Sequence, residues 1–337
     1  MAMTEREALI ALNLSLGANL AQIKVWRESL GSYRAIVEAD SETLHRYRIS
    51  SKTNAVEAAE NLKKSKWEDE LLRAEKDEVE ILTITDDAYP ELLRQIHLAP
   101  LALYCRGNIE CLNQCLVAMI GSRNASNYGI DSAKKLAANL AEAGVGVVSG
   151  LATGIDAAAH CGALDGGGTT IGVLGGALNC FYPKENIALA KRMVENDGLV
   201  ISEFPFNYEP TKFTFPRRNR IISGLCRCVV AIETPASSGT SSAVSVNTPI
   251  RCLPNSRIAR LWRFPDGLTH SVQKAATDLF AMEPELSPAQ RISLTNWANL
   301  SPEPLLENSG NKMQSEATFS ASHRCLTKRS SFGMFSR

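Results

Sequence analysis

The sequence predicts an α/β protein: a doubly wound, Rossmann-like parallel sheet with a small N-terminal helical domain and an irregular C-terminal tail. Short runs rich in β-branched residues alternate with helical stretches between residues 79 and 232. These runs are almost continuously apolar, which is typical of parallel strands covered on both faces. The alternation is missing before residue 78 and after Thr240, so other structure is expected at both ends.

Residues 1–77 are predicted to form a helical domain of the SAM or helix-hairpin kind. Leu9, Leu12 and Leu16 recur at intervals of three and four residues, and this apolar stripe continues to Gly31. A second charged, alanine-containing helix is expected over residues 53–73. Its lysine run at residues 63–66 could contact nucleic acid, but a solvated helix face is the favoured interpretation.

Residues 78–282 are predicted to form the Rossmann-like domain. Strands are expected in the runs 81–84, 117–120, 145–148, 170–174, 199–201 and 229–232. One intervening helix is expected to be capped by Asp131 and to end at Gly144, and another covers residues 184–196. Right-handed crossovers between parallel strands make such a sheet doubly wound.

The sequence pattern changes after Thr240. Residues 241–265 show no clear period, residues 268–282 form a helical pattern, and residues 283–337 are polar and rich in serine. We expect this last segment to be largely disordered.

Composition restricts the function classes. The chain has 337 residues and a formal net charge of zero, which does not favour an indiscriminate polyelectrolyte binder. It contains no apolar run long enough to span a membrane, and the early Glu5 and Glu7 are unlike a secretory signal. Nine cysteines without zinc-like spacing suggest a reducing, cytoplasmic setting with no metal site. We expect no cofactor.

Polar and basic residues follow several predicted strands, where ligands bind in an open parallel sheet. The densest segment has three arginines in four positions beside an aromatic residue. Arginine matches phosphate oxygens with a planar fork of donors and can stack on a base. The proposed binding residues are Gly121, Ser122, Arg123, Ser149, Gly150, Lys184, Phe215, Arg217, Arg218, Asn219 and Arg220.

Each of these short motifs also has a structural interpretation. The arginine segment could be a helix start that pairs with Glu203 and Glu233, and Gly121-Ser122-Arg123 could be only a tight turn. Neither a dinucleotide fingerprint nor a Walker-type phosphate loop is present in the sequence. The common position of the polar and basic motifs at one edge of the sheet nevertheless favours an anion-binding groove. Aromatic residues on which bases could stack flank the basic positions, at Phe181, Tyr182, Phe213 and Phe215. Core packing is the alternative for each, and Phe215 is a better candidate for stacking.

Candidate catalytic residues are few. His160 follows three alanines and lies one helical turn after Asp156, but no nucleophile motif accompanies it. Glu203 and Glu233 each end a predicted strand, so a carboxylate pair is conceivable. Capping or arginine-anchoring roles are at least as consistent with the sequence, and we expect a binding protein rather than an enzyme.

These motifs, in this order, resemble the DNA-processing protein A family, known as DprA or Smf. The matching segments are DDAYPELL (86–93), YCRG (104–107), VAMIGSR (117–123), SGLATGIDAAAH (149–160), YPKEN (182–186), SEFP (202–205) and FPRRNRIISG (215–224). The resemblance implies a Rossmann-like core that binds single-stranded DNA, transfer of that DNA to the RecA recombinase during natural transformation, and a homodimer. It also implies that Gly121, Ser122, Arg123, Lys184 and the arginine segment line the groove.

The chain also departs from this family. The family's sheet normally continues after Ser238-Gly239-Thr240 with a further helix and strand, and the familiar pattern is lost there, as a local change of reading frame would produce. We therefore expect the edge strand near Ile232 to lack cover, with impaired stability and dimerisation.

A second functional hypothesis is a nucleotide phosphoribohydrolase of the lysine-decarboxylase-like Rossmann group. It is suggested by the Gly175-Gly176 loop and by Ser238-Gly239-Thr240 following Glu233. The order of the glutamate and the glycine-threonine pair is reversed relative to that group.

Overall fold

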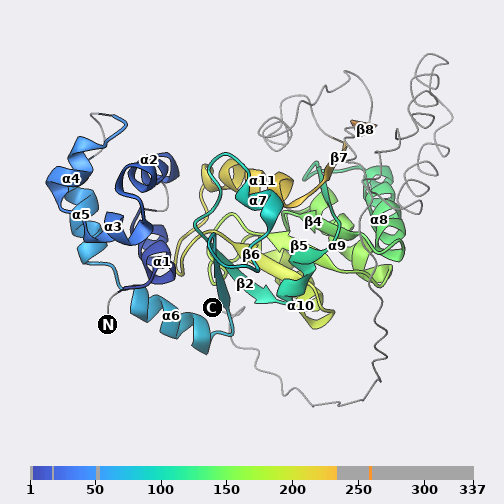
Figure 1. Cartoon of the computed structure of the whole chain (residues 1–337). Coiled ribbons are helices and arrows are strands. Elements are labelled where there is room, and N and C mark those ends of the chain that lie inside the picture. Colours follow the sequence, from blue (N-terminus) through green and yellow to red (C-terminus); the bar gives the residue numbers. More distant parts are fainter. Residues whose placement is uncertain (1–2, 17–18, 51–53, 234–257, 260–337) are drawn as a thin grey trace, which may run out of the picture.

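The computed structural model describes residues 3–16, 19–50, 54–233 and 258–259, and Figure 1 shows the arrangement of its elements. The helix predicted over residues 268–282 and the tail predicted over residues 283–337 lie outside the described residues. Helices occupy the N-terminal region and an α/β sheet follows, so the predicted fold class is confirmed.

The N-terminal region contains six helices within the described residues, and the first five pack around an apolar cluster of their own. The helices are α1 (Glu5–Leu16), α2 (Leu20–Leu30), α3 (Tyr33–Glu38), α4 (Ser41–Arg46), α5 (Ala55–Lys63) and α6 (Trp67–Lys76). Leu9, Leu12 and Ile23 are buried beside Trp26, whose indole nitrogen donates to the Leu44 carbonyl over 3.0 Å. Helix α2 ends at Gly31, whose φ of 85° suits glycine.

The single helix predicted over residues 53–73 is instead two helices, α5 and α6, separated at residues 64–66. The two halves pack against different partners. Leu62 of α5 belongs to the N-terminal cluster, whereas Ala74 of α6 packs with residues of the sheet. One straight helix could not pack against both the N-terminal cluster and the sheet. The junction Lys64-Ser65-Lys66 also contains no apolar residue that would favour continuation of the helix.

The sheet has the strand order β1-β2-β6-β5-β4-β3-β7-β8 within the described residues. Its strands are β1 (Glu80–Thr83), β2 (Ala102–Gly107), β3 (Leu116–Gly121), β4 (Gly146–Ser149), β5 (Thr170–Val173), β6 (Leu199–Ser202), β7 (Cys228–Ile232) and β8 (Ile258–Ala259). The five strands β6, β5, β4, β3 and β7 are mutually parallel, as predicted. At the β1 edge of the sheet the pairing is antiparallel instead: β2 pairs with β6, and β1 pairs with β2.

Strand β8 pairs antiparallel with the end of β7, with Ile258 opposite Ile232 and Ala259 opposite Ala231. The expectation that this edge lacks a partner is therefore wrong for these two positions. The expected effects on stability and dimerisation stay predictions.

Helices cover both faces of the sheet. On one face lie α8 (Asn127–Glu142), α9 (Ile155–Asp165) and α10 (Ile187–Glu195), and on the other lie α7 (Glu91–Arg94) and α11 (Thr214–Leu225). Two 3-10 helices, η1 (Ile109–Asn113) and η2 (Lys184–Asn186), complete the described elements. Helix α8 begins earlier than predicted, because Ser126 rather than Asp131 caps it by accepting a hydrogen bond from the Gly129 amide over 3.1 Å.

The N-terminal helices hold the segment that follows β6. Asn13 of α1 is buried and donates to the Glu203 carbonyl over 3.1 Å. Glu70 of α6 accepts a hydrogen bond from the Phe206 amide over 2.8 Å. Because this segment leads directly into α11, the N-terminal region helps to fix one wall of the site described below.

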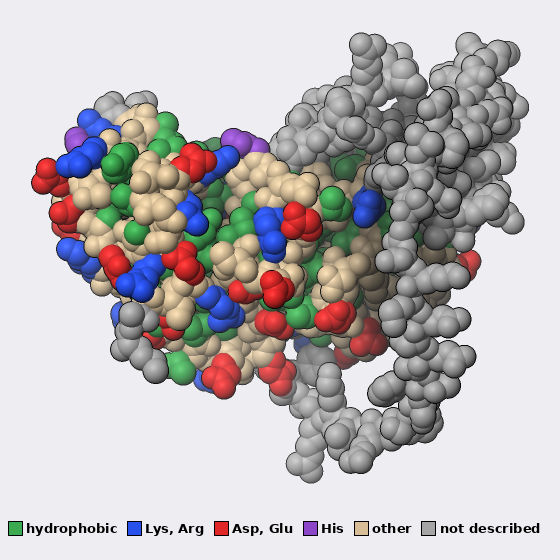
Figure 2. All heavy atoms as spheres, viewed as in Figure 1, with side chains coloured by type: hydrophobic (Ala, Val, Ile, Leu, Met, Phe, Trp, Pro, Cys, Tyr) green, Lys and Arg blue, Asp and Glu red, His purple; other side chains and the backbone are tan. Residues whose placement is uncertain are grey.

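No helix in the described residues is both long and apolar enough to cross a bilayer. Figure 2 shows positive and negative side chains interspersed over the visible face of the helices and the sheet, in keeping with the net charge of zero.

Candidate nucleic-acid interface

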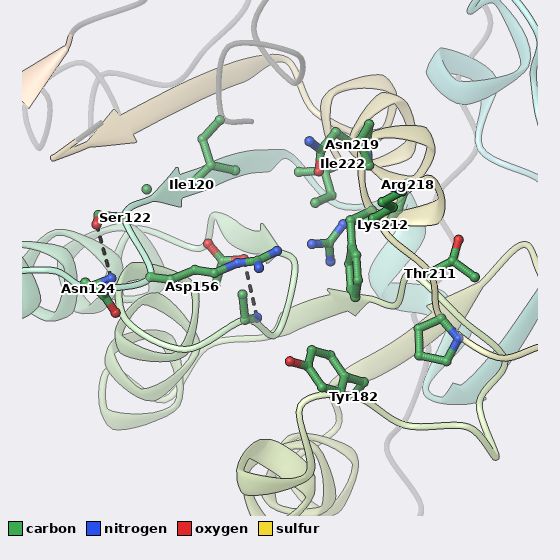
Figure 3. A pocket seen from close by; sticks show the side chains of 16 residues that line it. Ile120, Ser122, Asn124, Asp156, Tyr182, Thr211, Lys212, Arg218, Asn219 and Ile222 are labelled. Atoms are coloured by element: carbon green, nitrogen blue, oxygen red, sulfur yellow. Dashed lines mark hydrogen bonds between the residues drawn. The ribbon is translucent and has the colours of Figure 1, made fainter. Parts of the chain in front are cut away.

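A cavity of about 770 Å³ lies at the carboxyl ends of the parallel strands. It is lined by residues from the loops that follow β3, β4, β5 and β6 and from the first turns of α11 (Figure 3). Strand order changes direction at β3, since the chain runs from β3 to β4 on one side and returns as β7 on the other. Such a switch point is where open α/β sheets bind ligands.

Two segments contact the loop after β3: the start of α9 and Glu233. The Ser122 carbonyl accepts a hydrogen bond from the Ile155 amide over 3.1 Å. Gly154, with a φ of 79°, lies so close to this carbonyl that any side chain there would collide with it. The Glu233 carboxylate accepts from the Ser126 amide over 2.7 Å and from the Ser126 hydroxyl. These contacts fix the backbone of the loop. Arg123, which lies in this loop, is exposed.

An aromatic pair forms the opposite part of the cavity. The ring centroids of Tyr182 and Phe215 are 5.8 Å apart at an angle of 55°. The guanidinium carbon of Arg123 lies 5.4 Å from the Phe215 centroid, within the range of a cation–π contact. Gly175 provides room for the Phe215 ring, because a Cβ there would lie 2.7 Å from it. Tyr182 is 54% exposed, so part of its ring is open to a ligand.

Lys212 also lines the cavity, and sequence reasoning missed it. It is an exposed residue of the loop between β6 and α11. A lone lysine in a loop carries little signal in a sequence, although its position three residues before Phe215 could have indicated it. Exposed positive charge at the cavity thus comes from Arg123 and Lys212 on separate loops.

The arginine segment has a different structure from the one predicted. It forms the first turns of α11 rather than a loop at the sheet edge. Arg218 lines the cavity but is only 4% exposed, and its Nη1 donates to the Gly150 carbonyl over 2.5 Å and to the Val173 carbonyl. Burial and the neighbouring Arg123 charge lower the pKa of Arg218 to about 10, while Asp156 opposes this shift. Arg218 is charged at neutral pH but is occupied internally.

Arg217 and Arg220 pair with one buried carboxylate. The Glu203 side chain is 1% exposed, and it accepts from Arg217 over 3.0 Å and also from Arg220. Arg220 is buried, and Arg217 stacks over Phe204 with its guanidinium carbon 5.3 Å from the ring centroid. Neither arginine lines the cavity. The interpretation as a helix start paired with Glu203 is therefore correct for these two residues.

Three other predicted site residues also lie outside the cavity lining. The Ser149 hydroxyl is buried and donates to the Met119 carbonyl over 2.5 Å, which links β4 to β3. Gly150 is needed for packing, because a Cβ there would collide with the Arg218 guanidinium. Lys184 is exposed in η2. Of the predicted set, the structure brings together Gly121, Ser122, Arg123, Phe215, Arg218 and Asn219.

Asp156 also lines the cavity, and its carboxylate interacts electrostatically with Arg218. Its carboxylate accepts hydrogen bonds from the amides of Gly150, over 3.1 Å, and Ala152, over 3.4 Å. Burial raises the pKa of Asp156, and the Arg218 charge and these donors oppose the shift. A carboxylate at this position disfavours a phosphate beside it, so phosphates are better placed near Arg123 and Lys212.

The remaining candidate catalytic groups are all in structural contacts. His160 is fully buried and its Nδ1 lies 2.7 Å from the Thr170 hydroxyl. Burial lowers the pKa of His160 to about 3, so it is neutral at physiological pH. Glu203 pairs with Arg217 and Arg220, and Glu233 accepts hydrogen bonds from Ser126 at the start of α8. The segment Ser238-Gly239-Thr240 lies outside the described residues. Within the described ranges, no group of three His, Cys, Asp or Glu residues could hold a metal ion.

Comparison with known proteins gives a consistent family. The family model for DNA recombination-mediator protein A matches residues 80–276. This match extends beyond Thr240, further than the individual motifs indicate. The DNA processing protein DprA of Streptococcus pneumoniae is 42% identical over 198 residues, a stretch that covers 58% of this chain and 68% of that protein. Protein Smf of Escherichia coli is 39% identical over 160 residues, covering 48% of this chain and 43% of that protein.

Comparison of the fold with solved structures points to the same family. The X-ray structure of DprA from Streptococcus pneumoniae superimposes with a TM-score of 0.61 and 29% identity, covering 88% of this chain and 98% of that one. The sequence match spans less than half the length of the Escherichia coli relative. The chain belongs to the DNA recombination-mediator protein A family.

Proposed function

We propose that the cavity binds unpaired DNA as part of a recombination-mediator function. The observation that carries this proposal is the placement of Arg123 over Phe215, with Tyr182 beside it. Exposed aromatic rings offer faces on which bases stack, and nearby cations contact the phosphates between them. The description of the family as recombination mediators supports DNA as the ligand.

Single strands fit this arrangement better than duplexes. In a duplex the base faces are stacked on one another, so the rings of Tyr182 and Phe215 could reach only base edges or the backbone. The exposed cations that line the cavity are few and come from loops rather than a broad basic face. A chain of zero net charge therefore relies on a local groove instead of a long-range field.

Membership of the family supports proposals for the finer roles. We propose that the bound strand is passed to the RecA recombinase in the cytoplasm, that the protein acts as a homodimer, and that it binds DNA without catalysing a reaction on it. RecA filament formation on single strands, followed with and without this protein, tests the first of these roles. Acceleration of filament formation is expected, and no change in the rate would contradict it.

Binding itself is tested by fluorescence anisotropy with a labelled oligothymidylate and a duplex of the same length. We expect tighter binding of the single strand and a linear fall of log K with log salt concentration, because phosphate contacts release counterions. Equal or tighter binding of the duplex would contradict the proposal, as would binding that does not change with salt.

A further inference from the structure

We propose that Phe213 is a second base-stacking position, placed just outside the cavity on the path of the same strand. This inference rests on the proposed function, since it assumes that unpaired DNA occupies the cavity. It adds a subsite that the family motifs in the sequence do not include, because the FPRRNR segment begins at Phe215.

The first observation is the exposure of the ring. Phe213 is 74% exposed, the largest value among the large exposed hydrophobic residues of the described chain, against 54% for Tyr182 in the cavity. Leaving a phenylalanine in water forgoes the favourable free energy of burying its apolar surface. The fold therefore gains little from this ring, whereas a ligand with a flat apolar face could cover it.

The second observation is the rigidity of the turn that carries the ring. The Thr211 amide donates to the Thr214 hydroxyl oxygen over 2.9 Å, and the Thr214 hydroxyl and amide both donate to the Thr211 carbonyl, over 2.9 and 3.1 Å. The Phe213 amide donates to the Thr211 hydroxyl oxygen over 3.3 Å. These bonds fix the backbone on both sides of Phe213, so stacking a base there orders only the side chain.

The third observation is the position of Lys212. This residue lines the cavity, and its Nζ also lies 5.1 Å from the centroid of the Phe213 ring. A cation next to an exposed ring is the combination that binds single strands, with the base on the ring and the phosphate on the cation. Lys212 thus links the cavity to the exposed ring.

The fourth observation is continuity along the chain. Phe213 and Phe215 are two residues apart, so their Cα atoms are separated by at most about 7 Å. Thr211 and Lys212, which precede Phe213, line the cavity, as does Phe215 after it. A strand that leaves the Tyr182–Phe215 pair along this segment would meet Phe213 next. The occupant to which these observations point is an unpaired nucleotide adjoining the one in the cavity.

The experiment compares Phe213→Ala, Phe213→Leu and Phe213→Trp with the unaltered protein in binding a labelled oligothymidylate. Phe213→Ala is expected to weaken binding about 5- to 150-fold, the range for loss of one stacked base. Phe213→Leu should be similarly weak, because it keeps apolar area but loses the aromatic face. Leu72→Ala is a matched control: Leu72 is 65% exposed on α6, outside the cavity lining, and its loss should leave affinity unchanged.

Phe213→Trp gives a direct readout of stacking. We expect quenching of the additional tryptophan fluorescence when the oligonucleotide binds, measured against the four native tryptophans of the unaltered protein. The inference is overturned if the unaltered protein binds single strands while Phe213→Ala binds equally well or Phe213→Trp shows no quenching. A protein partner as the true occupant would give this same result. Failure of the unaltered protein to bind single strands would instead contradict the proposed function.

Discussion

Two sets of cationic residues lie within a short distance of each other and have opposite environments. Arg123 and Lys212 are exposed on loops beside the cavity. Arg218 and Arg220 of α11 are buried, and Arg217 is held by Glu203. The second set is far more conspicuous in the sequence, yet the first set is the one open to a ligand.

The difference is explained by the acceptors around each side chain. Helix α11 crosses the ends of strands whose carbonyls, at Gly150 and Val173, accept hydrogen bonds from Arg218. Glu203, at the end of β6, supplies a carboxylate to both Arg217 and Arg220. These arginines therefore form part of the wall of the site, whereas Arg123 and Lys212 remain accessible to a ligand.

The largest expected effect is on stability. Arg220→Ala removes one of the two charge partners of the buried Glu203 carboxylate and leaves Arg217 as the other, so we expect a loss of about 3 kcal/mol, the lower end of the range for a broken buried pair. Chemical denaturation should show this loss in the free energy of unfolding. Arg123→Ala is the control, and its exposed position predicts a change within about 0.5 kcal/mol. Equal stability of the two variants would remove the distinction between the two sets.

The next effect is on DNA binding. Phe215→Ala removes the ring that faces Tyr182 and Arg123, and we expect a loss of about 1–3 kcal/mol in binding of a single-stranded oligonucleotide. Anisotropy titration measures it directly. Affinity equal to that of the unaltered protein would show that the aromatic pair serves only for packing.

A third effect appears in the pH dependence of stability. The pKa of buried His160 is about 3 in the folded protein, and it returns to about 6.5 on unfolding. Between these values the unfolded chain binds the additional proton, so stability falls as pH decreases from about 6.5 towards 3, by up to about 1.4 kcal/mol per pH unit.

His160→Gln removes this contribution, and Asp156 remains common to both proteins. The free energy of unfolding, measured from pH 7 to pH 5, should therefore fall less steeply for the variant. Parallel curves would mean that His160 does not resist protonation in the folded state.

The smallest expected effect concerns a cation outside the cavity. Lys184, like Lys212, is an exposed cation, but it does not line the cavity. Lys184→Gln should therefore change single-strand affinity by less than about 0.3 kcal/mol, within the range of a distant surface charge. A loss similar to that of Lys212→Gln would extend the interface to η2.

Local signals in the sequence, namely apolar periodicity and the residues at strand ends, were enough to predict the parallel core and the loops at its carboxyl edge. They also predicted the positions of Arg123 and Phe215. Strand β2 was missed because its sequence, ALYCRG, ends in polar residues and its pairing with β6 depends on a distant segment. The burial of Arg218 and Arg220 could not be predicted for the same reason, and the binding roles expected for the α11 arginines stay predictions. Their partners, Gly150, Val173 and Glu203, are brought to them only by the folded sheet.

The most direct test of the proposed interface is the salt dependence of single-strand binding by Arg123→Gln/Lys212→Gln. Each exposed cation that contacts a phosphate contributes about 0.7 to the slope of log K against log salt concentration. We expect a slope shallower by about 1.4 in this double variant, with unchanged stability. A slope equal to that of the unaltered protein would show that other cations hold the DNA, and it would contradict the proposed interface.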